Sequence, residues 1–255
     1  MLAACFGLWA ALGGVGERIL DLIFPKRCVQ CGLPGEWLCA ECATQLRSVE
    51  VGCRRCGRPS SRPTESCPEC RGRELAFVGA VAAFVYEGPA RRLVTACKFR
   101  HLRSLAREMA RLAEPRFRAA LPGAPSLVTC VPADRGRRLE RGFNLAELLG
   151  RELAAGAGVR FASVLVRERG GARQSALSGE RRRTNVAGAF SVSAEAVPLV
   201  RAVKRVVIVD DVYTTGETLN QCAHALQEIG CEVHAFTFAR TVRRARPTVA
   251  ETETS

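Results

Sequence analysis

The sequence is poor in aromatic residues, in histidine and in acidic residues, and each shortage narrows what the protein can be. Aromatic residues make up 6% of the 255 positions, so a core must be mostly aliphatic, which the hydrophobic fraction of 47% can supply. The three histidines, His101, His224 and His234, are scattered and indicate no metal centre. Asp and Glu number 25 against 38 Lys and Arg, and the net charge of +13 favours a nucleic acid, a phosphorylated small molecule or an anionic surface as partner over a merely solubilised surface.

A positively charged start, which an export signal requires, is missing as well. The first charge is Glu17, and the apolar run that ends at Gly16 is too short to cross a bilayer. We therefore expect a cytoplasmic location, no stable membrane insertion, and an N-terminal packing helix over residues 1–24. Thiols stay reduced in the cytoplasm, so the 13 cysteines are available to bind metal.

Eight of the cysteines form four Cys-x-x-Cys pairs. These residues are Cys28, Cys31, Cys39, Cys42, Cys53, Cys56, Cys67 and Cys70. Two thiolates at this spacing lie on one tight turn, and two such turns complete the tetrahedral Cys₄ shell that structural zinc prefers. The pattern predicts two structural zinc ions, in preference to iron–sulfur clusters or redox thiols.

The spacing leaves the pairing of the four turns open. Sequential ribbons use the first four cysteines for one ion and the last four for the other, whereas a cross-brace interleaves them. The short connectors favour the sequential arrangement. Gly32 and Gly57 each follow a second cysteine, where the turn often needs a positive φ. We assign residues 25–72 to this zinc region and expect neighbouring arginines such as Arg54 and Arg55 to hydrogen-bond the sulfurs.

Beyond residue 72 the cysteine pairs cease, and strand and helix patterns alternate. Strands are expected within residues 75–86, 127–131, 190–193, 206–209 and 232–238, and helices within 88–99, 102–112, 145–155 and 217–228. The β-branched run at 206–209 is typical of a central parallel strand that is covered on both faces. These patterns predict an α/β domain with a parallel sheet over residues 73–240, and a disordered polar tail over 241–255.

The strand at 206–209 ends in two acids and a turn rich in threonine and glycine. The string comprises Asp210, Asp211, Thr214, Thr215, Gly216, Glu217 and Thr218. The threonine hydroxyls and the N–H groups of the helix start form an anion site, and the glycine lets a phosphate approach the backbone. The Gly-Lys-Ser/Thr of a P-loop is absent. Since a phosphate alone would not favour two carboxylates beside it, the acids indicate a phosphorylated sugar whose hydroxyls they bind.

This string resembles the motif of type I phosphoribosyltransferases that binds 5-phosphoribosyl-1-pyrophosphate (PRPP), and other segments are similar to the competence protein ComF family. The segments are Tyr86-Glu87-Gly88-Pro89, Lys98-Phe99-Arg100 and Arg141-Gly142-Phe143-Asn144. The resemblance implies a type I phosphoribosyltransferase-like domain behind a double zinc ribbon. It also implies PRPP held with Mg²⁺, the two acids in the catalytic role, and a part in natural transformation with incoming single-stranded DNA and DNA-uptake or helicase-type proteins.

Basic residues outside the loop are candidates for contacts with pyrophosphate or DNA. They are Lys98, Arg138, Arg141, Arg173, Arg181 and Arg182. The arginines within 167–183 suit a lid over pyrophosphate or contacts with DNA phosphates, and a solvated loop is the plain alternative. Phe99 and Phe143 are candidates for stacking on bases, although lone phenylalanines belong more often to the core.

Two functions stay open from the sequence. One is a phosphoribosyltransferase whose acceptor the sequence does not identify. The other is a non-catalytic adaptor that senses PRPP or a nucleotide, or binds DNA, and docks partner proteins through the zinc region.

Overall fold

The structure is a computed structural model that describes residues 26–99, 103–121, 127–134, 136, 141–168 and 189–242. Three expectations from the sequence fall outside these residues: the helix over 1–24, most of the tail over 241–255, and the candidate contacts of Arg138, Arg173, Arg181 and Arg182. Within the described residues, no helix has both the length and the apolar character that crossing a membrane requires.

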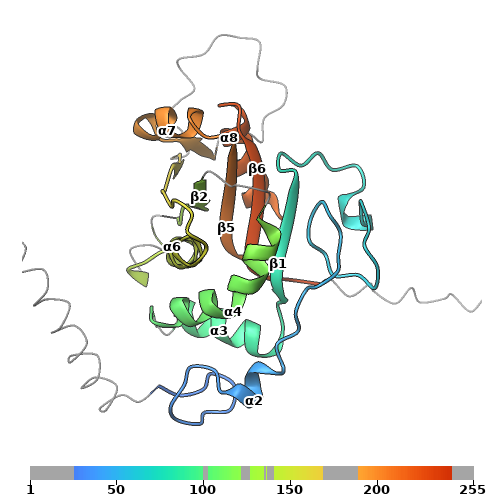
Figure 1. Cartoon of the computed structure of the whole chain (residues 1–255), viewed down its shortest axis with the longest axis vertical. Helices are drawn as coiled ribbons and strands as arrows, with labels where there is room; N and C mark the ends of the chain where they lie inside the picture. Colours follow the sequence, from blue (N-terminus) through green and yellow to red (C-terminus); the bar gives the residue numbers. More distant parts are fainter. Residues whose placement is uncertain are drawn as a thin grey trace, which may run out of the picture.

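A four-stranded parallel sheet forms the centre of the structure (Figure 1). Its order is β1-β6-β5-β2, with β1 at Gly79–Val85, β6 at Glu232–Arg240, β5 at Arg205–Tyr213 and β2 at Leu127–Cys130. Residues 206–209 of β5 are buried by side chains on both faces of the sheet, as their β-branched run predicts. The parallel α/β class expected from the sequence is confirmed.

Helices cover both faces of this sheet. One face packs against α3 (Gly88–Phe99), α4 (Leu105–Ala120) and α6 (Leu145–Ala157), and the other against α7 (Val197–Arg201) and α8 (Glu217–Gln227). Because α8 follows β5 directly, its N-terminus lies at the carboxyl end of a central strand, where open α/β sheets bind their ligands.

Two features differ from the expectation. A short antiparallel pair, β3 (Leu165–Arg167) with β4 (Phe190–Val192), includes a strand of three residues that is too short to show a pattern in the sequence. The central strand β5 also continues past residue 209, because β6 pairs with it as far as Tyr213 and Arg240. The two acids therefore lie within the paired strand and not in a free loop.

Two cysteine-rich lobes, one with the short helix α2 (Ala40–Ala43) and one with the 3₁₀ helix η1 (Pro68–Cys70), flank the sheet (Figure 1). The first packs on the core of α3, α4 and α6, and the second packs on the core of α8. Between them the backbone pairs with the outer edge of β1: the Val49 N–H donates to the Ala83 carbonyl over 2.9 Å. This pairing shields an edge strand that would otherwise be open to association.

Candidate functional site

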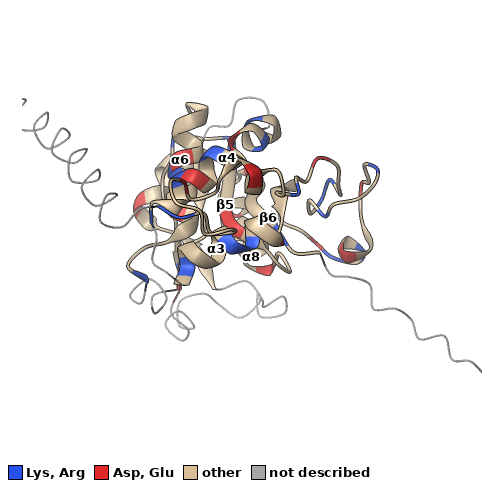
Figure 2. Cartoon of the chain, turned by 90° about the horizontal axis from the view of Figure 1, so that it is seen from below, with Lys and Arg blue, Asp and Glu red and all other residues tan. Residues whose placement is uncertain are grey.

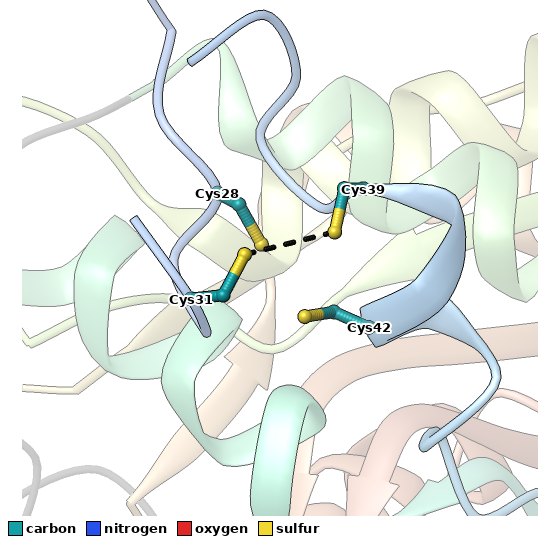
Figure 3. Close-up of side chains that lie close together, drawn as sticks. All are labelled: Cys28, Cys31, Cys39 and Cys42. Carbon is teal, nitrogen blue, oxygen red and sulfur yellow. Dashed lines mark hydrogen bonds between the residues drawn. The ribbon is translucent and has the colours of Figure 1, made fainter. Parts of the chain in front are cut away.

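The eight cysteines gather into two groups of four in sequential order. The first group is Cys28, Cys31, Cys39 and Cys42 (Figure 3), and the second is Cys53, Cys56, Cys67 and Cys70. Within each group the sulfurs lie within 4.8 Å of one another, so the fold adopts the sequential alternative and not the cross-brace. Gly32 and Gly57 have φ of 82° and 68°, as expected for the turns behind the second cysteine.

The geometry of both groups fits zinc. The Sγ atoms of Cys31 and Cys39 are 3.7 Å apart, and those of Cys56 and Cys67 are 3.6 Å apart. Tetrahedral Zn–S bonds of about 2.3 Å place neighbouring sulfurs about 3.8 Å apart. Burial alone would raise the pKa of Cys53, but backbone N–H groups, those of Cys56 and Cys67 among them, lower it to about 7, which favours the thiolate that zinc binds.

The arginine that contacts a sulfur of the second group comes from the far end of the chain. Arg240 ends β6 and is 1% exposed; its Nη2 lies 3.3 Å from the Cys56 Sγ and 2.7 Å from a Glu69 carboxylate oxygen. Arg55, expected to bind sulfur, instead donates to the carbonyl oxygens of Cys70 and Arg73 at 3.3 and 2.8 Å. The sequence could not reveal Arg240, because 184 positions separate it from Cys56.

The phosphate loop, residues 214–218, presents the start of α8 to solvent. Thr214, Thr215, Glu217 and Thr218 are exposed, while Gly216 is buried. Gly216 is the N-cap residue and has a φ of 79°, which a residue with a side chain rarely adopts. The N–H groups of the first turn and the helix dipole together favour an anion at this position.

The two acids lie beside the loop and have different surroundings. Lys98 of α3 holds the Asp211 carboxylate, with its Nζ 2.8 and 2.7 Å from the two oxygens. An Asp210 oxygen accepts the Asp211 N–H at 2.8 Å. Burial, and next the charge of Asp211, raise the pKa of Asp210 from 3.8 to about 8. In Figure 2 the acidic part of β5 lies next to basic residues of α3.

This arrangement suits sugar hydroxyls. A protonated carboxyl donates one hydrogen bond and still accepts others, whereas an ionised carboxylate only accepts. In the free protein, Asp210 and Asp211 thus offer a donor and several acceptors, and if a cation ionises Asp210, both acids accept from the O–H groups of a pair of hydroxyls.

Of the basic candidates, Lys98 and Arg141 are in the described part of the chain. Lys98 is engaged with Asp211, and the Arg141 guanidinium lies 5.5 Å from the centre of the Phe99 ring. Phe99 is 68% exposed. Phe143, the other stacking candidate, is 6% exposed and packs in the core, so it is not available to a base.

Asn144, in the string that carries the family resemblance, has a structural role. Its Nδ2 donates to the Val131 carbonyl at 2.9 Å, and its Oδ1 accepts the Ala146 N–H at 3.2 Å. The side chain therefore caps α6 and ties it to the end of β2. Near that end, Asp134 lies 3.8 Å from the Arg167 Nε.

Comparisons with known proteins cover both parts of the chain. Residues 19–71 match the family described as double zinc ribbon domain, and residues 102–252 match the phosphoribosyl transferase domain. The DNA utilization protein YhgH of Salmonella typhi is 31% identical over 232 residues, which are 87% of this chain and all of that protein. Competence protein F of Haemophilus influenzae is 30% identical over 82% of this chain and 94% of its own length. A solved adenine phosphoribosyltransferase is 17% identical over 57% of this chain and 74% of that one, with a TM-score of 0.32.

We expect the purified protein to carry two zinc ions, because each sulfur group completes its own tetrahedral shell. Cys31→Ser and Cys56→Ser should each lose one ion, since they belong to different groups. Native mass spectrometry counts the ions in each variant. One ion in the wild type, or loss of both from Cys31→Ser, would show that the groups do not act as separate sites.

Asp210→Asn should stabilise the ligand-free protein at high pH. The folded pKa of about 8 lies above the unfolded value of 3.8, so ionisation removes stability progressively from about pH 4 to pH 8. Asparagine does not ionise, so the Tm of Asp210→Asn should equal that of the wild type near pH 4. The Tm of the variant should exceed that of the wild type by the largest amount at pH 8. Thermal denaturation at constant ionic strength measures this, with exposed Glu228→Gln as the control. A Tm difference that does not change with pH would contradict the assignment.

Proposed function

The chain belongs to the family of competence protein F and DNA utilization protein YhgH and carries a phosphoribosyl transferase domain, and from this premise we propose that it binds PRPP with Mg²⁺ between β5 and α8. One observation carries the proposal: the pair Asp210–Asp211 lies beside an exposed helix start whose N-cap is a buried glycine. The terminal phosphate lies on the N–H groups of the phosphate loop, and the ribose hydroxyls bind the two acids.

The acids also fit the Mg²⁺ that accompanies PRPP. Carboxylate oxygens are the hard donors that this ion prefers, and the bound ion offsets the charge of the pyrophosphate. Each oxygen of Asp211 has two lone pairs, so ribose hydroxyls bind it while Lys98 remains in place. A cation beside Asp210 favours the ionised carboxylate, so ligand binding lowers the pKa of Asp210 from its raised value.

In this proposal the protein acts by positioning and electrostatics. The loop fixes the phosphate end of the sugar, and the carboxylates lie where positive charge develops on the ribose as the pyrophosphate leaves. A nitrogen acceptor then takes the phosphoribosyl group, and the zinc region over residues 25–72 serves as a structural part of the 73–240 domain. No dedicated nucleophile is required.

A DNA-binding role is the second part of the proposal, in line with the names of the relatives and with a cytoplasmic part in transformation alongside DNA-uptake proteins. Exposed Phe99 with Arg141 over its ring supports it, because aromatic rings flanked by arginine bind single strands by stacking. Phe99 follows Lys98 in α3, so a base stacked there lies close to the acid pair. The net charge of +13 favours the same polyanion.

The double substitution Asp210→Asn with Asp211→Asn should weaken PRPP–Mg²⁺ binding by about 10-fold or more, because hydrogen bonds to charged groups contribute roughly 1.5–3 kcal/mol each. Isothermal titration measures the affinity, and Glu228→Gln is the matched control. No heat with the wild type, or equal affinity in the double variant, would remove the proposed site. Pyrophosphate release in the presence of nitrogen acceptors then separates a transferase from a sensor that only binds.

Phe99→Ala should weaken single-stranded DNA binding about 10-fold, since stacking on one ring contributes roughly 1–3 kcal/mol per base. Its salt dependence should stay as in the wild type, whereas Arg141→Ala should lower the salt slope by about one phosphate contact. Fluorescence anisotropy over a salt series measures both, and Leu33→Ala, an apolar residue 56% exposed on the first lobe, is the control. Unchanged affinity in Phe99→Ala would exclude this surface.

A further inference from the structure

Arg240 connects the second cysteine group with the last residue of β5. Its Nη2 bonds the Cys56 sulfur and the Glu69 carboxylate, and the centre of its guanidinium lies 4.0 Å from the centre of the Tyr213 ring. Arg240 and Tyr213 are neighbours across the β5–β6 ladder and are 1% and 2% exposed. A buried guanidinium needs an anionic partner, which the Glu69 carboxylate supplies, while the Cys56 sulfur accepts from the same nitrogen and the Tyr213 ring packs on the guanidinium.

Tyr213 in turn supports the phosphate loop from inside. Its phenol packs directly against the Cα of Gly216, where any Cβ would overlap the ring and its hydroxyl. The absence of a side chain at Gly216 therefore serves two ends, since it allows the left-handed φ and leaves room for the tyrosine. A shift of the ring would move the N-cap of α8.

Two further contacts join the same lobe to the loop. The Arg73 Nη1 donates to the Thr215 carbonyl at 2.8 Å, and the Arg73 carbonyl is itself held by Arg55 at 2.8 Å. One turn into α8, the Asn220 Oδ1 accepts the Ala76 N–H at 2.7 Å. The loop is thus tied to the segment leaving the second group at two points besides Tyr213.

From these contacts we infer that Arg240 is a positioning residue that couples the second zinc site to the phosphate loop. The inference rests on the proposed PRPP site, because Arg240 is inferred to fix the conformation of the phosphate loop in that site. A zinc ion shared by the four sulfurs would hold the Cys56 sulfur in place, and that sulfur lies 3.3 Å from the Arg240 Nη2, which also bonds Glu69 at 2.7 Å. Zinc occupancy therefore sets the position of Arg240, and through Tyr213 that of the N-cap of α8.

The link must work in both directions. If zinc at the second group stabilises the loop shape that binds PRPP, then bound PRPP stabilises zinc at that group by the same factor. The first group, which packs on the opposite core, makes none of these contacts among the described residues and should be indifferent.

Arg240→Met in the full-length protein tests the link. The variant keeps all eight cysteines, and Glu69 retains Arg58, whose Nη1 is 3.6 Å away. Second-site zinc should pass to a chromophoric chelator about 10-fold faster, as is typical when a group that contacts a metal ligand is removed. Hydrogen exchange, followed by mass spectrometry, should accelerate about 10-fold at residues 214–220. The α6 peptide should not change, and Arg201→Met, an exposed arginine of α7, should match the wild type throughout.

Two further variants test whether the effect depends on the charge and shape of Arg240 and on the second zinc site alone. Arg240→Lys keeps the charge but lacks the planar fork, so it should fall between wild type and Arg240→Met. Cys31→Ser, which empties the first site, should leave exchange at residues 214–220 unchanged. Equal acceleration in α6 would indicate general destabilisation, and unchanged loop exchange in Arg240→Met would show that no link exists; either result overturns the inference.

Titration of PRPP–Mg²⁺ is read separately, because zinc release and hydrogen exchange need no ligand. If loop exchange accelerates in Arg240→Met but the wild type binds no PRPP, the proposed function is refuted and the link between zinc site and loop stands. PRPP binding that is the same in Arg240→Met and wild type would refute the link and leave the function standing. With both correct, PRPP–Mg²⁺ slows zinc release from the second site about 10-fold in the wild type, and the effect is lost in Arg240→Met.

Discussion

Two neighbouring carboxyl groups at the end of a buried strand are the constraint on which the site depends. Burial disfavours the ionised form of Asp210, and the negative charge of the adjacent Asp211 disfavours it further. The protein places Lys98 on Asp211 and leaves Asp210 desolvated, so that its pKa is raised to about 8. The raised pKa costs stability in the free protein, and in the function we propose a ligand with hydroxyls, phosphate and a divalent cation offsets that cost. The proposal of a phosphorylated sugar as ligand rests on this pair and on the exposed helix start beside it.

The zinc region is built into the domain and is not a separate head. The two lobes pack on opposite cores, and the backbone between them completes the edge of the sheet along β1. Each lobe is too short to bury a large core of its own, so metal ligation adds local stability. The second lobe also lies against the strand end that carries the acids, where Arg240 brings the sulfur group and the phosphate loop into one network.

The sequence predicted those features whose residues lie close together along the chain. The Cys-x-x-Cys turns, the β-branched run before Asp210 and the threonine–glycine loop are each contained in a short segment, and the parallel sheet follows from their alternation with helices. Arg240, Tyr213 and Lys98 were different, because their roles depend on which distant strands and helices the fold brings together. Phe143 was a stacking candidate only because the sequence does not show that it is buried in the core, whereas Phe99, of the same type, is exposed.

The protonation of the acid pair is the most direct test of this account. Carboxyl ¹³C NMR, with Asp210→Asn used to assign the resonance, follows each aspartate through a pH titration. The account predicts that Asp210 titrates near pH 8 in the free protein and that its pKa falls when PRPP and Mg²⁺ are added. Titration of Asp210 near the ordinary value of about 4, unchanged by the ligand, would contradict it.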